Sequence, residues 1–148
     1  MSLVASCGLS GKPDEQEDAV TETRTRITEV GRVMVPVADQ DRAIEFYVEK
    51  LGFEKRADIP YGEGARWVEV APPGGATAIG LVLPREGDPV GIDTHVALST
   101  KDAGATHADL RAAGVDTDAE VMRMGDPVPP MFFVRDQDAN TLLVVESN

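Results

Sequence analysis

The sequence is poor in cysteine and contains no long apolar run. Its single cysteine, Cys7, excludes an intramolecular disulfide framework and a cysteine-rich zinc site. No apolar stretch approaches the roughly 18 residues that a membrane-spanning helix requires. Glycine-rich phosphate loops and nucleophile elbows are absent as well. These absences leave a soluble protein, which we expect to be cytoplasmic.

Basic residues are also scarce, because 14 Lys and Arg stand against 26 Asp and Glu, for a formal net charge of −12 at pH 7. This excess of acid argues against nucleic-acid binding, which needs cations to neutralise phosphates. It argues against docking on anionic lipid for the same reason. The length of 148 residues and the hydrophobic content of 42% are those of a single globular domain. We therefore expect an acidic domain that handles a small molecule.

The first 25 residues differ from the rest, because they are poor in large apolar residues after Leu9 and carry a polar run at residues 14–18. They are predicted to form a disordered acidic tail. Cys7 lies in this tail and is not proposed as a nucleophile. Residues 26–148 are expected to form the folded domain.

Apolar periodicity predicts strands and helices in that domain. Val33, Val35 and Val37 alternate with other residues and predict a strand. Asp39 is a candidate N-cap of the helix that follows, and Gly52 is placed to end it. Further strands are expected over residues 66–71, 77–83, 94–99, 132–135 and 141–146.

The pattern repeats along the chain. A second helix begins after Asp102, 63 positions beyond Asp39, and closes at Gly114, 62 positions beyond Gly52. Each unit reads strand–helix–strand–strand, with a third short strand. We therefore expect an α+β fold of two βαβββ modules, with two sheets that form a cupped cleft and helices outside. Module 1 covers residues 26–84, a linker 85–91, and module 2 residues 92–148.

Three segments resemble the vicinal oxygen chelate superfamily, which groups glyoxalase I, bleomycin-resistance proteins and extradiol dioxygenases. Residues 39–53 resemble its signature D-x-x-x-A-x-x-F-Y … L-G-F. Residues 66–72 and 133–140 resemble its middle and closing motifs, although Gln137 and Ala139 replace the usual proline and glycine. The resemblance implies a glyoxalase-like domain. It does not imply one reaction, because the superfamily includes lyases, transferases, dioxygenases and binders without catalysis.

Strand alternation predicts which side chains face the cleft, because neighbours along a strand point to opposite faces. The same rule places Leu83 on the helix side. The set expected in the cleft is Arg32, Met34, Pro36, Trp67, Glu69, Gly80, Val82, Asp93, His95, Ala97, Thr141, Leu143 and Val145. Phe132 is added as a second aromatic wall because it lies 63 positions after Glu69.

The resemblance implies four metal-ligand positions on the inner strands, which His and Glu occupy in the metalloenzymes. The equivalent positions in this chain are Arg32, Gly80, His95 and Leu143, of which His95 alone can be a ligand. Glu69 shares the inner face with His95 and is a better substitute ligand than Glu146, which lies three positions beyond Leu143 and is therefore expected on the opposite face. We expect no cofactor, with a divalent metal as the alternative.

Three of the cleft residues allow two interpretations each. His95 is either a metal ligand or substrate contact, able to act as a general base, or a hydrogen-bonded structural residue. Arg32 either clamps an anion or pairs with Glu69 or Asp93. Trp67 is either core filler or a stacking wall for a planar ligand.

Two functions follow from these alternatives. The first is a small-molecule-binding protein with a degraded metal site, whose cleft is lined by Arg32, Trp67, Glu69 and His95. Its acidic surface favours cationic ligands. Met34, Asp93, Phe132 and Leu143 complete this binding site. The second is a metal-dependent lyase, isomerase or dioxygenase that uses His95 with Glu69. The loss of three ligand positions favours the first. The resemblance also implies a homodimer, with the cleft within one chain or between two.

Overall fold

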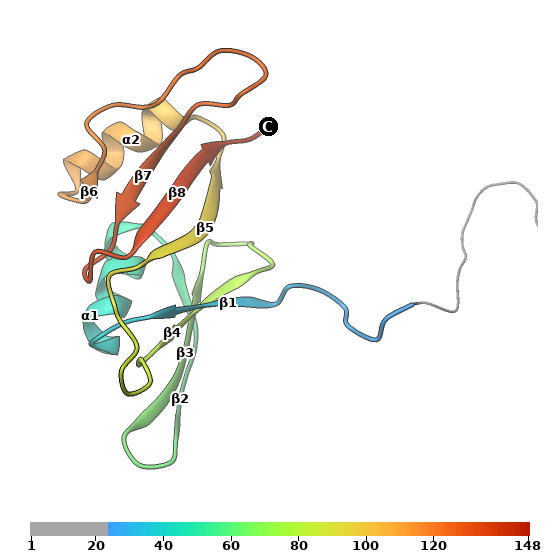
Figure 1. Ribbon diagram of the computed structural model, residues 1–148, viewed down its shortest axis with the longest axis vertical. Helices are drawn as coiled ribbons and strands as arrows, with labels where there is room; N and C mark the ends of the chain where they lie inside the picture. The colour runs from blue at the N-terminus through green and yellow to red at the C-terminus, as the bar shows by residue number, and fades with distance from the viewer. Residues whose placement is uncertain (1–23) are drawn as a thin grey trace, which may run out of the picture.

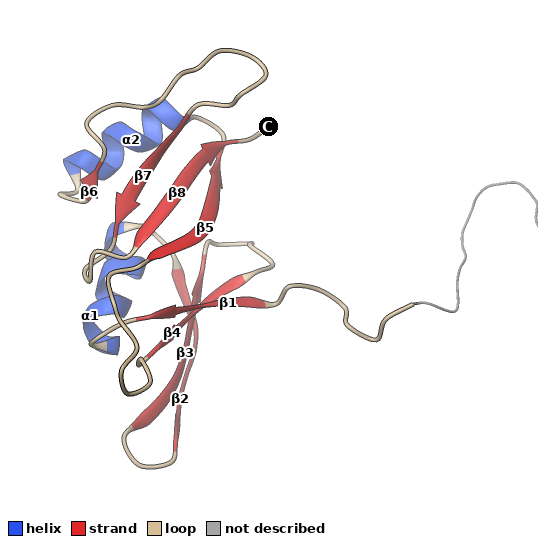
Figure 2. Ribbon diagram, viewed as in Figure 1, coloured by secondary structure: helices blue, strands red, loops and turns tan. Residues whose placement is uncertain are grey.

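The computed structural model describes residues 24–148, which form two similar modules in succession (Figures 1 and 2). The predicted tail at residues 1–25 lies outside this part, apart from its last two residues. No helix within residues 24–148 is long and apolar enough to cross a membrane.

The first module is a four-stranded sheet with one helical segment. Its elements are β1 (Arg32–Pro36), α1 (Gln40–Glu45), the π-helical turn η1 (Phe46–Lys50), β2 (Glu54–Tyr61), β3 (Ala65–Ala71) and β4 (Ala78–Val82). The strand order is β1-β4-β3-β2, with β1 parallel to β4. As predicted, Asp39 caps α1, because its carboxylate accepts a hydrogen bond from the Arg42 amide at 3.1 Å.

The second module repeats this arrangement. It consists of β5 (Asp93–Thr100), α2 (Ala103–Ala112), β6 (Asp116–Thr117), β7 (Met131–Arg135) and β8 (Thr141–Glu146). Its strand order is β5-β8-β7-β6, with β5 parallel to β8. Asp102 caps α2 through the Ala105 amide at 3.0 Å. The two βαβββ modules predicted from the repeat are therefore confirmed.

One face of each sheet is buried under helices, and one apolar core runs through both modules. Val35 and Val37 of the first module lie in it, as their alternation predicted. The other face of each sheet carries the half-buried and exposed positions. Leu83 was expected on the helix side, and this is wrong. It follows the last residue of β4 and is exposed, because the alternation rule no longer applies where the strand has ended.

Phe132 also lies on the face opposite to the predicted one. It is fully buried against the helix side, where its ring packs edge-on against His107 with centroids 4.9 Å apart. The cause is a change of offset between the modules. Glu69 pairs with Gly80, whereas Phe133 pairs with Leu143, so the third strands are related by 64 positions rather than 63. A slip of one residue reverses the face of every side chain.

A buried polar network joins the modules. The Tyr47 hydroxyl, from the first module, donates to Asp136 Oδ2 at 2.8 Å. Asn140 Nδ2 donates to the same oxygen and to the Pro36 carbonyl, each at 2.9 Å. Burial, followed by the charge of Asp136, raises the pKa of Tyr47 far above its usual value, so the phenol stays protonated as a donor. The network holds the end of β1 against the β7–β8 turn.

Removing the tyrosine hydroxyl should weaken this junction. Tyr47→Phe is expected to lower the free energy of unfolding by about 1–3 kcal/mol, because the buried Asp136 carboxylate loses a donor. Equilibrium unfolding in urea measures this change. Tyr61→Phe is the control, because the Tyr61 hydroxyl is exposed and forms no hydrogen bond with residues 24–148. Equal losses in the two variants would contradict the role given to Tyr47.

Candidate ligand-binding site

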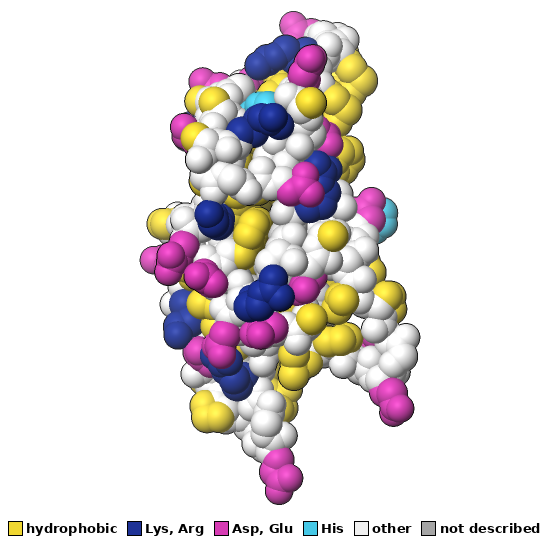
Figure 3. Space-filling view, turned by 90° about the vertical axis from the view of Figure 1, so that its left-hand side faces the viewer, with side chains coloured by type: hydrophobic (Ala, Val, Ile, Leu, Met, Phe, Trp, Pro, Cys, Tyr) yellow, Lys and Arg dark blue, Asp and Glu magenta, His cyan; other side chains and the backbone are white. Residues whose placement is uncertain are grey.

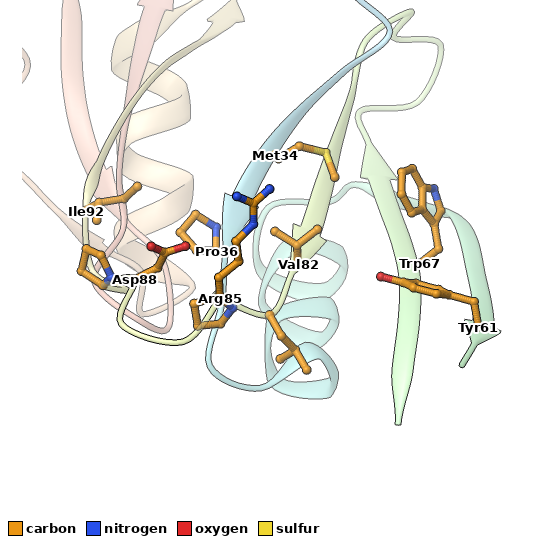
Figure 4. Close-up of a pocket in the computed structure, with 11 residues that line it drawn as sticks. Met34, Pro36, Tyr61, Trp67, Val82, Arg85, Asp88 and Ile92 are labelled. Carbon is orange, nitrogen blue, oxygen red and sulfur yellow. The ribbon is translucent and has the colours of Figure 1, made fainter. Parts of the chain in front are cut away.

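The open face of the first sheet contains a hollow of about 610 Å³. Strands β1, β3 and β4 form its floor, and the tip of β2 and the linker loop at residues 83–92 form its sides (Figure 4). Figure 3 shows the β2–β3 hairpin and the linker loop as two projections, with hydrophobic side chains gathered between them. The lining residues are Met34, Pro36, Tyr61, Trp67, Val82, Leu83, Pro84, Arg85, Asp88, Pro89 and Ile92.

Trp67, the single tryptophan of the chain, is held on this open face by Glu69. The Glu69 Oε2 atom accepts hydrogen bonds from Trp67 Nε1 and from Arg32 Nε, each at 2.7 Å. The guanidinium carbon of Arg32 lies 5.8 Å from the centre of the indole ring, at cation–π distance. Arg32 thus pairs with Glu69, one of the two interpretations above. Trp67 is 37% exposed and lines the hollow, so it is not core filler.

Arg66 fixes the hairpin that carries Trp67. Its guanidinium binds both Asp58 oxygens, at 3.1 and 2.7 Å, and also binds Asp41 of α1 at 2.8 Å. Hydrogen bonding to Arg66 is the largest cause that lowers the pKa of Asp58 from 3.8 to about 2. Because Arg66 is next to Trp67 on β3, the two side chains point to opposite faces. The ion pairs on one side therefore position the indole on the other.

Met34 forms part of the floor, and its side chain covers Gly80 on the neighbouring strand β4. Met34 pairs with Gly80 across β1 and β4. A Cβ atom at Gly80 would lie 2.7 Å from the Met34 Sδ atom. The thioether therefore occupies the space where the resemblance implied a metal ligand.

The four positions that the resemblance assigned to a metal do not form a suitable ligand set. Arg32 is a permanent cation engaged with Glu69, and the space beside Gly80 holds the thioether of Met34. Leu143 offers no donor. Within residues 24–148, no three His, Cys, Asp or Glu side chains lie close enough together to hold a metal ion. The expected substitute, Glu69, is already bound by Arg32 and Trp67.

His95 lies away from the first-sheet hollow. It sits where the β5–β8 pairing is irregular, with a left-handed φ of 58° and a side chain that is 85% exposed. Its backbone amide donates to Asp93 Oδ1 at 3.0 Å. A second hollow of about 470 Å³ includes His95 together with Val33 and Phe53. The β5 pattern of alternation does not reveal this irregularity.

The structure thus brings together four of the predicted site residues: Arg32, Met34, Trp67 and Glu69. Asp93, His95 and Leu143 belong to the second sheet and do not line the same hollow. The sequence interpretation missed the contributions of Tyr61, Arg85, Asp88 and Ile92. Tyr61 was assigned to a turn, and the linker residues have no periodicity that predicts their direction.

Comparison with known proteins agrees with this fold. The sequence profile of the Glyoxalase/Bleomycin resistance protein/Dioxygenase superfamily matches residues 29–144. The chain therefore belongs to this superfamily. The uncharacterized protein YetH of Bacillus subtilis (strain 168) is 32% identical over 123 residues, which cover 81% of this chain and 99% of YetH.

Two solved structures are similar over most of the chain. TnmS3, an antibiotic binding protein from Streptomyces sp. CB03234, has 33% identity and a TM-score of 0.73, covering 84% of this chain and 100% of TnmS3. A member of the same superfamily from Sphaerobacter thermophilus has 31% identity and a TM-score of 0.77, with 83% and 100% coverage.

The Asp58–Arg66 pair predicts a pH-dependent stability. Asp58→Asn should lower the free energy of unfolding at pH 7 by about 1 kcal/mol or less. Since folding lowers the pKa of Asp58 to about 2, the contribution is present above its unfolded value of 3.8 and is lost as the pH falls toward 2. Thermal melting of both proteins at pH 7, 4 and 2.5 measures the difference.

The control is Glu86→Gln, which removes the same charge from the exposed linker, where Glu86 forms no ion pair with any residue from 24 to 148. It should melt like the unmodified protein at pH 7. A difference for Asp58→Asn that persists unchanged at pH 2.5 would contradict the assignment.

Proposed function

We propose that the protein binds a planar, largely apolar small molecule in the first-sheet hollow and does not transform it. The observation that carries this proposal is the position of Trp67. A large aromatic ring is held by one hydrogen bond to Glu69, which Arg32 in turn holds, and is left partly exposed in an apolar hollow of about 610 Å³. That volume is in the range of small-molecule sites, and an indole of fixed orientation is suited to stack on a flat ring.

The comparisons support the same class of function. TnmS3, which is 33% identical, is an antibiotic binding protein. We extend small-molecule binding, without the identity of the antibiotic, to this chain. Preorganisation adds to the argument, because Glu69 and Arg66 already fix the hairpin and its indole, so little side-chain entropy is lost when a ligand stacks there.

The metal-dependent lyase, isomerase or dioxygenase receives less support. It needs His95 and Glu69 in one site, but His95 lines a different hollow and Glu69 is bound by Arg32 and Trp67. The first-sheet hollow contains Arg85 and Asp88 as its charged lining residues, which are not a metal-ligand set. We therefore derive no catalytic step.

We also propose that the protein is a homodimer with an isologous interface. Several large apolar side chains on or beside the open face of the first sheet are exposed in the single chain, and such patches mark contact surfaces. They include Ile59 on β2 and Val30 just before β1, which lie outside the hollow proposed to bind the ligand. Light scattering in solution distinguishes a dimer from a monomer of 15.8 kDa.

Ligand binding is tested with N-phenyl-1-naphthylamine, a neutral dye with flat rings. We expect it to quench the fluorescence of Trp67, the single tryptophan. Trp67→Ala should weaken binding at least about fivefold, as measured by the fluorescence of the dye, because the stacking surface is lost. Met124→Ala is the matched control, since Met124 is an exposed apolar residue outside the hollow. Binding that is unaffected by Trp67→Ala would refute the proposal.

Metal binding separates the two functions. After incubation with Ni²⁺, Zn²⁺, Mn²⁺ or Fe²⁺ and removal of free ions, the protein should retain substoichiometric metal, because the four candidate positions supply one donor side chain, His95. His95→Ala should leave the metal content and dye binding unchanged. One metal ion per chain, lost in His95→Ala, would instead support the enzyme.

A further inference from the structure

Arg85 is the one arginine among the residues that line the hollow. Figure 4 shows its side chain rising from the linker loop in the direction of Met34, whereas Asp88 lies on the side of Ile92. The Arg85 guanidinium donates no hydrogen bond to any residue from 24 to 148, and it forms no ion pair with them. Arg32, by contrast, is paired with Glu69. The hollow therefore presents one exposed cation that has no protein partner among residues 24–148.

The loop that carries Arg85 is constrained at both ends. On the side of β4, the Val37 amide donates to the Val82 carbonyl at 2.8 Å and continues the β1–β4 pairing. On the side of β5, Asn140 Oδ1 accepts hydrogen bonds from the Gly91 and Ile92 amides, each at 3.0 Å. Asn140 is fully buried, so this end of the loop is tied to the core.

The middle of the loop is a tight turn. The Asp88 amide donates to the Arg85 carbonyl at 2.9 Å. Gly87 has a left-handed φ of 89°, which a glycine adopts without strain. Pro84 and Pro89 flank the turn and restrict its backbone further. Arg85 thus lies on a short turn with a restricted backbone at the edge of the hollow. Little backbone conformational entropy is therefore lost when its guanidinium binds a ligand.

We propose that Arg85 selects ligands that carry an anionic oxygen group, such as a carboxylate, a phenolate or a sulfonate, on a planar ring system. The ring stacks against Trp67, as the proposed function requires, and the guanidinium of Arg85 donates hydrogen bonds to the charged oxygens. A guanidinium is planar and always charged, so it pairs with such groups in a fixed orientation. This inference rests on the proposed binding site and adds the charge of its ligand.

Two dyes with the same ring skeleton test this selection. 1-Anilinonaphthalene-8-sulfonate carries one sulfonate, and N-phenyl-1-naphthylamine lacks it. Both are titrated into the full chain, with energy transfer from Trp67 as evidence that the dye lies in the hollow. Arg85→Met should weaken sulfonate binding about tenfold, the loss of one partly exposed charged pair, and change binding of the neutral dye less than about twofold.

Two variants control for general charge and for geometry. Arg42→Met removes one positive charge from α1, outside the hollow, and should leave both dyes unaffected. Arg85→Lys keeps the charge but not the planar guanidinium, and should recover part of the sulfonate affinity. Thermal melting confirms that Arg85→Met is folded.

The outcomes distinguish this inference from the proposed function. If Arg85→Met leaves the sulfonate dye unchanged, or weakens both dyes equally, the selection by Arg85 is refuted while Trp67-dependent binding of the neutral dye stands. If neither dye receives energy from Trp67 in the unmodified protein, the proposed binding site and the selection by Arg85 are both refuted. A sulfonate loss in Arg42→Met as large as that in Arg85→Met would also refute it, because net charge would explain the effect.

Discussion

The buried carboxylate of Asp136 holds the two modules in one arrangement. It accepts hydrogen bonds from the Tyr47 hydroxyl and from the Asn140 side chain and amide. A carboxylate taken out of water is costly unless such donors surround it, so alternative packings of the modules that separate it from Tyr47 are disfavoured. Asn140 in turn holds the start of β5 through Gly91 and Ile92. The same network therefore sets the position of the linker loop at the edge of the hollow.

A second carboxylate, Glu69, determines the chemistry of the open face. In a metal site, a carboxylate on an inner strand would coordinate the ion. Here its Oε2 atom accepts from Arg32 and Trp67, which neutralises its charge and fixes the indole. The Met34 thioether covers the backbone at Gly80. The open face of the first sheet therefore has the features of an apolar platform with an oriented aromatic ring, which is the basis of the proposed binding function.

Sequence patterns predicted the elements that depend on local rules. The strand with alternating valines and the aspartate caps at 39 and 102 depend on strand pleat and helix termini, and they were confirmed. Val35 and Val37 lie in the core as expected, whereas Val33 is half-buried and lines the second hollow. Phe132 was misplaced because the repeat was taken as rigid, whereas one extra residue shifts the offset before β7. The strand β2 was not located because Glu54, Lys55, Arg56 and Pro60 mask its periodicity. Arg85 belongs to a linker, where tertiary contacts rather than periodicity set the direction of side chains.

The charge of the whole chain is a poor guide to the charge of its ligand. A net charge of −12 led us to expect that cationic ligands are favoured. At physiological salt, however, exposed charges more than about 8 Å apart are largely screened, so a bound molecule responds to the groups beside it. Near the hollow, Glu69 already neutralises Arg32, and Asp88 lies on the side of Ile92. The guanidinium of Arg85 is the one cation of the lining without a partner among residues 24–148, and it points toward Met34, away from Asp88, so it favours an anion in spite of the acidity of the chain.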